Sequence, residues 1–118
     1  MPQYLVISSN NELFRIADEH IMYISADGNY CHFMQSSGES RLVTAQLGQI
    51  EQIISSQIKE AEKHFLRIGK SLIINRTYIH YINISRQQLV LADKQLGKHT
   101  LTASQEALRK LKELIEKE

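Results

Sequence analysis

The sequence is poor in the residues from which covalent frameworks and metal sites are built. Its 118 residues contain one cysteine, Cys31, which excludes an intrachain disulfide framework and any cysteine-rich zinc site. A single thiol also fits a reducing compartment. The five histidines lack the close spacing of paired zinc ligands; they are His20, His32, His64, His80 and His99. We therefore expect no metal ion and no other cofactor.

Signatures of catalysis are missing as well. Gly69, Lys70 and Ser71 look like the end of a phosphate-binding loop, but the earlier glycine of that motif is absent. Cys31 and His32 are neighbours, but on a strand their side chains point to opposite faces and would not pair as nucleophile and base. We therefore expect that the protein is not an enzyme, and we assign Cys31 to structure.

Long apolar runs are also absent. No stretch approaches the roughly 18 consecutive apolar residues of a membrane span. Residues 1–4 lack the basic region and the apolar run that open a signal peptide. The length suits one domain with a modest core. We expect a cytoplasmic protein with a single domain over residues 1–118, with no membrane partner and no small-molecule substrate.

Acidic residues are missing from one long stretch. No Asp or Glu occurs between Glu62 and Asp93, and the cations in this interval are Lys63, Arg67, Lys70, Arg76 and Arg86. The formal net charge is +1, with −4 over residues 1–40 and +5 over the remainder. Clustered positive charge indicates a polyanionic partner such as nucleic acid. A solvated sheet face is the ordinary alternative for such a cluster.

The pattern of apolar residues predicts a mainly β architecture. Short apolar or alternating runs between polar turns predict about eight to ten strands. Three of them, at 21–24, 29–34 and 40–43, should form an antiparallel meander, with the positive φ of its first turn supplied by Gly28. The other runs lie at 4–7, 12–17, 65–68, 72–74, 78–84, 88–91 and 98–102, with the last turn at 93–97.

Two helices are also predicted, one among the strands and one at the C-terminus. Apolar residues at helical spacing over 47–54 predict a helix after Thr44, which is placed to act as its N-cap and which should fray near residues 55–56. The C-terminal helix begins after either Thr102 or Ser104, both of which can cap it. Its apolar positions form one stripe, typical of a helix packed on a sheet.

The order of these pieces resembles the LytTR-type DNA-binding domain of bacterial transcriptional regulators. Residues 21–30 (IMYISADGNY) are similar to the family's I-x-Y-I-x-A-x-x-N-Y segment. Residues 65–75 (FLRIGKSLIIN) are similar to its F-x-R-x-H-R-S-y-l-V-N signature. Residues 102–104 suit the segment that opens the terminal helix. The resemblance extends from about residue 13 to residue 115.

The resemblance implies antiparallel strands in small stacked sheets, whose loops at one edge enter successive major grooves of double-stranded DNA. Cations and hydroxyls would lie on phosphates, and a few side chains would read base edges. The implied DNA-binding residues are Asn29 and Tyr30 in the first loop, Gln46 near a phosphate, Arg67, Lys70 and Ser71 in the second loop, and Ser104, Gln105 and Arg109 in the third. Lys70 is the leading base reader. Asn75 is assigned to structure, closing a turn.

Two positions depart from the family pattern. Gly69 stands where the family usually has histidine. The third loop reads Ser104-Gln105-Glu106 where an arginine commonly follows the serine, so Gln105 would replace only part of that contact. Glu106 has the wrong sign to face phosphate, although an acid is favourable near a helix N-terminus. A base-reading arginine supplies about 1–3 kcal/mol of discrimination, so weaker or altered specificity is expected.

The implied function is sequence-specific DNA binding that regulates bacterial transcription, as the output domain of a response regulator. Family members commonly occupy direct repeats, so a second copy on the same DNA is an expected partner. The chain has no room for a receiver domain, so a phosphorylation signal would come from a separate signalling protein, unless the chain is an excised domain. The alternative, favoured by Glu106, is a protein-interaction or oligomerisation module of the same fold with lost or weak DNA affinity.

Overall fold

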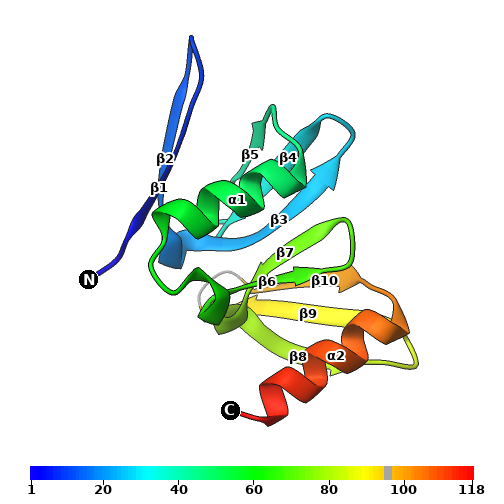
Figure 1. The fold of residues 1–118 in the computed structure, drawn as a ribbon. Helices are drawn as coiled ribbons and strands as arrows, with labels where there is room; N and C mark the ends of the chain where they lie inside the picture. The colour runs from blue at the N-terminus through cyan, green and yellow to red at the C-terminus, as the bar shows by residue number, and fades with distance from the viewer. Residues whose placement is uncertain (95–96) are drawn as a thin grey trace.

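The computed structural model describes residues 1–94 and 97–118, shown in Figure 1. Over these residues the fold has ten strands and two α-helices: β1 (Tyr4–Ser8), β2 (Leu13–Ala17), β3 (Ile21–Asp27), β4 (Tyr30–Gln35), β5 (Ser40–Val43), α1 (Leu47–Gln57), β6 (Phe65–Ile68), β7 (Leu72–Asn75), β8 (Ile79–Asn83), β9 (Gln88–Asp93), β10 (Gly97–Thr102) and α2 (Gln105–Glu116). Three short 3₁₀ turns, Asp18–His20, Ala61–Lys63 and Arg76–Tyr78, join some of them. The mainly β prediction with two helices is confirmed. Part of the turn predicted at 93–97 lies outside the described residues.

The strands form three antiparallel sheets. The largest has the order β5-β4-β3-β7-β6, a second has the order β10-β9-β8, and β1 pairs with β2 in a separate hairpin. The predicted meander is therefore present as β3, β4 and β5, and Gly28 turns the chain between β3 and β4 with φ of +60°. Because β3 pairs with both β4 and β7, it lies at the centre of the five-stranded sheet.

The central strands of the five-stranded sheet, β3 and β7, are covered on both faces. On one face α1 and the β1–β2 hairpin pack on residues such as Ile24, Phe33 and Ile73, and the rings of Phe14 and Phe33 meet edge to face at 5.4 Å. On the other face the three-stranded sheet and α2 cover residues such as Ile74. Since neighbouring strand residues point to opposite faces, this arrangement explains why residues 72–74 are continuously apolar.

The observed ends of α1 correct the sequence prediction. The N-cap is Gln46 and not Thr44, because the Gln49 side chain reaches back and its Oε1 accepts the Gln46 backbone N–H at 2.8 Å. The helix also continues past residues 55–56 to Gln57. The Gln57 side chain bonds to both the backbone N–H and the carbonyl of Val6, at 2.8 and 2.9 Å, which holds the last turn against β1.

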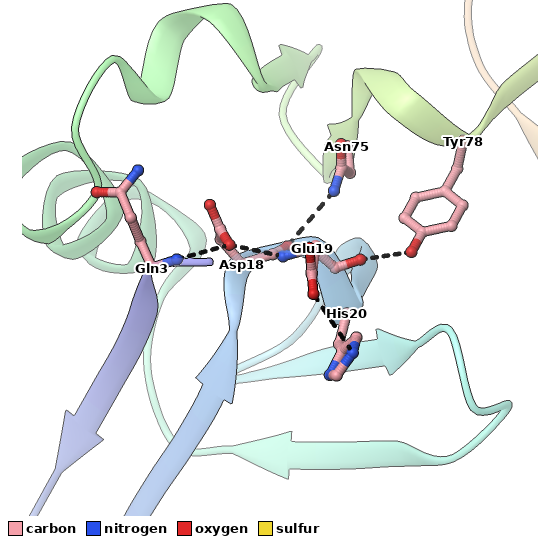
Figure 2. A network of polar contacts seen from close by, with 6 residues as sticks. All are labelled: Gln3, Asp18, Glu19, His20, Asn75 and Tyr78. Atoms are coloured by element: carbon pink, nitrogen blue, oxygen red, sulfur yellow. Dashed lines mark hydrogen bonds and ion pairs between the residues drawn. The ribbon is translucent and has the colours of Figure 1, made fainter. Parts of the chain in front are cut away.

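A polar network closes one end of the five-stranded sheet (Figure 2), and we call this end the network end. Asn75 is 4% exposed, and its side chain donates to the carbonyl of Ile21 at 2.9 Å and accepts from the Thr77 N–H at 3.1 Å. The backbone carbonyl of Glu19 accepts from the hydroxyl of Tyr78. The prediction that Asn75 closes a turn is therefore confirmed.

Three turns project from the opposite end, which we call the turn end. They are the β3–β4 turn at residues 28–29, the β6–β7 turn at residues 69–71 and the β10–α2 connection at residues 103–104. In Figure 1 they follow one another down the right-hand side of the molecule, whereas the N-terminus lies on the left. The fold thus brings residues from three distant segments to one edge.

Candidate nucleic-acid interface

The β3–β4 turn presents an amide and an aromatic ring. Asn29 and Tyr30 are exposed, Tyr30 to 43%. Gln46, at the start of α1, donates through Nε2 to Oδ1 of Asn29 at 3.1 Å. This bond fixes the Asn29 side chain through its oxygen. The side-chain N–H groups of Asn29 have no hydrogen-bond acceptor among the residues that the structure describes, so they are available to a ligand. The first loop and Gln46 therefore form one unit.

The β6–β7 turn is held in shape by Arg67. Its Nε donates to the carbonyl of Gly69 at 3.0 Å, and its Nη2 donates to the carbonyl of Lys70 at 3.2 Å. Its Nη1 bonds to Oε1 of Glu51, on α1, at 2.9 Å. Three of the five N–H donors of the guanidinium are therefore used within the protein, and its charge is balanced by the carboxylate of Glu51.

Lys70 and Ser71 complete this turn and are both exposed. The carbonyl of Ser71 accepts the Ala26 N–H at 2.8 Å, which ties the second turn to the end of β3 beside the first. Gly69 has φ of +60°, a backbone conformation that glycine adopts without strain. The backbone that carries Lys70 is thus held by the bonds from Arg67, by the bond between Ser71 and Ala26, and by the conformation of Gly69.

The β10–α2 connection faces the second turn across a groove of about 580 Å³. Ser104 is the N-cap of α2 and its Oγ accepts the Ala107 N–H at 3.1 Å, so the second of the two predicted helix starts is confirmed. Glu106 lies in the first turn and pairs with Lys110 at 3.4 Å. The groove is lined by Leu66, Arg67, Ile68, Gly69, Ser104, Glu106, Ala107, Lys110, Leu111 and Leu114. Gln105 and Arg109 are exposed but do not line it.

The cation-rich stretch is free of acids in sequence but not in space. Lys63 pairs with Glu60 at 3.2 Å, Arg67 with Glu51, and Arg76 with the terminal residue Glu118. Of the five cations, only Lys70 and Arg86 lack an ion pair within residues 1–94 and 97–118. Three of the five positive charges in this stretch are therefore balanced by acids from elsewhere in the fold. The other two cations, Lys70 and Arg86, lie in turns.

Cys31 and His32 behave as strand alternation predicts. Cys31 is fully buried and its Sγ donates to the carbonyl of Ala45 at 3.2 Å. Burial raises the pKa of this thiol, against a smaller lowering by the charge of Arg67, which disfavours a reactive thiolate. The His32 ring lies on the other face, 2.9 Å from Oδ2 of Asp27. The assignment of Cys31 to structure is therefore confirmed.

Two kinds of feature are absent from the described residues. Within residues 1–94 and 97–118 there is no cluster of three or more His, Cys, Asp or Glu side chains placed to hold a metal ion. None of the helices in the same residues is long and apolar enough to cross a membrane.

Amides, hydroxyls and a lysine at one edge of the fold are groups of the kind that contact phosphates and base edges of nucleic acids. Comparison with known families agrees: residues 11–116 match the model of the LytTr DNA-binding domain. The chain therefore belongs to the LytTR family, whose domain is a DNA-binding and transcription-regulating one and not an enzymatic one. No curated protein matches the sequence.

The fold also matches solved structures. One of them is the LytTr DNA-binding domain of a Bacillus cereus protein named as a methyl-accepting/DNA response regulator. The two chains are 14% identical and superpose with a TM-score of 0.64, over 96% of each chain. At this identity the similarity supports the arrangement of strands and helices, while residue roles must come from this chain's own geometry.

Proposed function

We propose that this domain binds double-stranded DNA sequence-specifically, with its three turns entering the major groove, and thereby regulates bacterial transcription. The observation that carries the proposal is Lys70, an exposed cation without an ion pair in the described residues, on a turn held by Arg67. A turn whose backbone is already held loses little backbone freedom on binding. The major groove offers acceptors on guanine that lysine can read.

The residues of the turn end divide into base readers and phosphate contacts. Asn29, with its amide N–H groups available, and Lys70 are proposed to read base edges. Hydroxyl and amide groups at Tyr30, Gln46, Ser71 and Ser104, together with Gln105 and Arg109 on the exposed side of α2, are proposed to approach the phosphates. A helix N-terminus also favours an anion.

Arg67 has a different role in this proposal from the one implied by family resemblance. Three N–H donors of its guanidinium are bonded to Glu51 and to two turn carbonyls. We therefore propose that Arg67 acts as a positioning residue for Lys70 and contributes little charge of its own to DNA binding.

Occupancy of direct repeats by two copies, and a signal received from a separate protein, remain part of the proposal. Occupancy of two repeats would raise the effective specificity, because two linked half-sites are read together. Neither requires a further contact within this chain. The single domain over residues 1–118 is likewise proposed as the DNA-binding unit.

The competing function is a protein-interaction or oligomerisation module with weak DNA affinity. Glu106 favours it, because this acid lines the groove between the second and third turns. Two observations reduce its weight: Glu106 pairs with Lys110, and it lies in the first turn of α2, where an acid is favourable for the helix.

Fluorescence anisotropy with a mixed-sequence duplex, titrated at several salt concentrations, tests the proposal. We expect binding that weakens steeply with salt, because each phosphate neutralised by a cation contributes about −0.9 to the slope of log K against log salt. Selection of an operator from random duplexes would follow. Absence of binding even at about 50 mM salt, where such contacts are strong, would favour the interaction module.

A further inference from the structure

We propose that the β8–β9 turn, residues 84–87, is a fourth DNA contact region and that Arg86 within it binds a backbone phosphate. The inference rests on the proposed function and extends it, because Arg86 belongs to none of the three turns described above. It follows from three features of this turn: its place in the fold, its rigidity and its charge.

The first feature is position. β9 is antiparallel to both β8 and β10, so β8 and β10 run in the same direction and end at the same edge. Figure 1 shows the loop that leaves β8 beside the start of α2. Two hydrogen bonds join the two segments: the Ala103 N–H donates to the carbonyl of Gln87 at 3.2 Å, and Gln87 Nε2 donates to the carbonyl of Ala103 at 3.3 Å. The turn thus adjoins Ser104.

The second feature is rigidity. Oδ1 of Asn83 accepts from the Ser85 hydroxyl and from the Arg86 N–H, both at 3.0 Å. The Gln87 N–H donates to the carbonyl of Ile84 at 3.1 Å. Gln87 has φ of +54°, a left-handed conformation that is uncommon outside glycine. Since such a conformation persists only where the surroundings hold it, the turn has one preferred shape.

The third feature is charge. Arg86 is exposed, and within residues 1–94 and 97–118 it has no acidic partner, in contrast to Arg67 and Arg76. Only its backbone N–H takes part in the turn, so its guanidinium is not needed to hold the fold. A guanidinium matches a phosphate through two parallel hydrogen bonds. The turn therefore offers an anion a guanidinium that has no ion pair in the described residues, carried on a backbone of fixed shape.

The test compares Arg86→Ala with Lys59→Ala in the full chain, using the same anisotropy titration with a mixed-sequence duplex. Lys59 is also an exposed cation, but its backbone N–H bonds to Gln3 at the network end, away from the turns. For Arg86→Ala we expect several-fold weaker binding and a salt slope smaller by about 0.9, the contribution of one phosphate contact. Lys59→Ala should match the wild-type protein, and Arg86→Lys should keep the wild-type slope.

The outcomes separate this inference from the function on which it rests. If the wild-type protein binds and Lys70→Ala weakens binding, while Arg86→Ala has the wild-type affinity and slope, the fourth contact region is wrong and the proposed function stands. If the wild-type protein does not bind DNA at any salt concentration, both are wrong. Thermal melting of each variant checks that the fold is kept, which we expect because the Arg86 side chain makes no intramolecular bond in the described residues.

Discussion

Asn75 and Asn29 are the same type of residue at opposite ends of the five-stranded sheet. At the network end Asn75 is buried and bonds through both its oxygen and its amide nitrogen. At the turn end Asn29 is exposed and uses only its oxygen, toward Gln46. A polar side chain whose groups are all satisfied within the protein maintains structure. One that is held in place with donors left over can recognise a ligand.

The same contrast applies to arginines. Arg76 pairs with Glu118 near the network end, whereas Arg86 stands without an ion pair in the described residues at the turn end. Arg67 lies at the turn end but behaves as a structural residue, because Glu51 and two carbonyls occupy it. Position alone therefore does not assign a role, and the bonds of each side chain must be read as well.

The largest effect is expected from Asn75→Ala. The substitution leaves the buried Ile21 carbonyl without its donor, which costs about 1–3 kcal/mol, and it removes the acceptor of the half-buried Thr77 N–H. We expect the free energy of unfolding, measured by urea denaturation, to fall by about 3 kcal/mol. Asn29→Ala is the matched control and should stay within about 0.5 kcal/mol of the wild type. Equal losses in the two variants would remove the distinction between the ends.

Lys70→Ala should weaken DNA binding and leave stability nearly unchanged, unlike Asn75→Ala, which should lower stability. We expect DNA affinity to fall by about 2 kcal/mol at an operator, the scale of one base contact, and the salt slope to flatten. The free energy of unfolding should change by less than about 0.5 kcal/mol, because Lys70 is exposed and makes no side-chain bond in the described residues. Lys63→Ala provides the control, since Lys63 pairs with Glu60. Wild-type affinity and slope in Lys70→Ala would place Lys70 outside the interface.

Much of the fold could be predicted from the sequence, because local pattern determines it. The strands follow from alternation and turn residues, and the apolar run of β7 reflects burial on both faces. The start of α1 was missed because Gln46 is not among the preferred N-caps and its N–H is satisfied by a side chain one turn later.

The candidate site could be predicted only in part. Motifs located the turns, but the state of each cation depends on contacts between distant segments. Arg67 meets an acid 16 residues earlier, on a helix whose packing the motif does not specify. Likewise, Arg86 joins the turn end only because the strand order is β10-β9-β8, which places its turn beside α2. Tertiary pairing is the information that a local pattern lacks.

Arg67→Ala tests whether Arg67 contributes charge to DNA binding or positions the turn that carries Lys70. Without the two bonds from Arg67 to the turn carbonyls, the backbone around Lys70 would have to be ordered on binding. This ordering costs about 1–2 kcal/mol for each residue fixed. We expect operator affinity to fall by a similar amount while the salt slope keeps its wild-type value, since Glu51 already balances this arginine. A slope smaller by about 0.9 would instead mean that Arg67 contacts a phosphate directly. Glu51→Gln, which frees the charge and keeps the turn bonds, should give a slope at least as steep as the wild type.

Glu106→Arg tests the competing function directly. It removes an acid from the groove and places a cation next to position 105, where the family commonly has an arginine, so we expect tighter binding and a salt slope steeper by about 0.9. The cost is the loss of a favourable acid in the first turn of α2, about 0.5 kcal/mol in the free energy of unfolding. Its ion pair with Lys110 adds little to that cost, because both side chains are largely exposed.

The salt slope of Glu106→Gln should fall between the slopes of the wild-type protein and of Glu106→Arg. If neither variant changes DNA binding while Lys70→Ala does, the third turn does not reach the DNA, and the groove beside it would be the part of the turn end that is available to a protein partner.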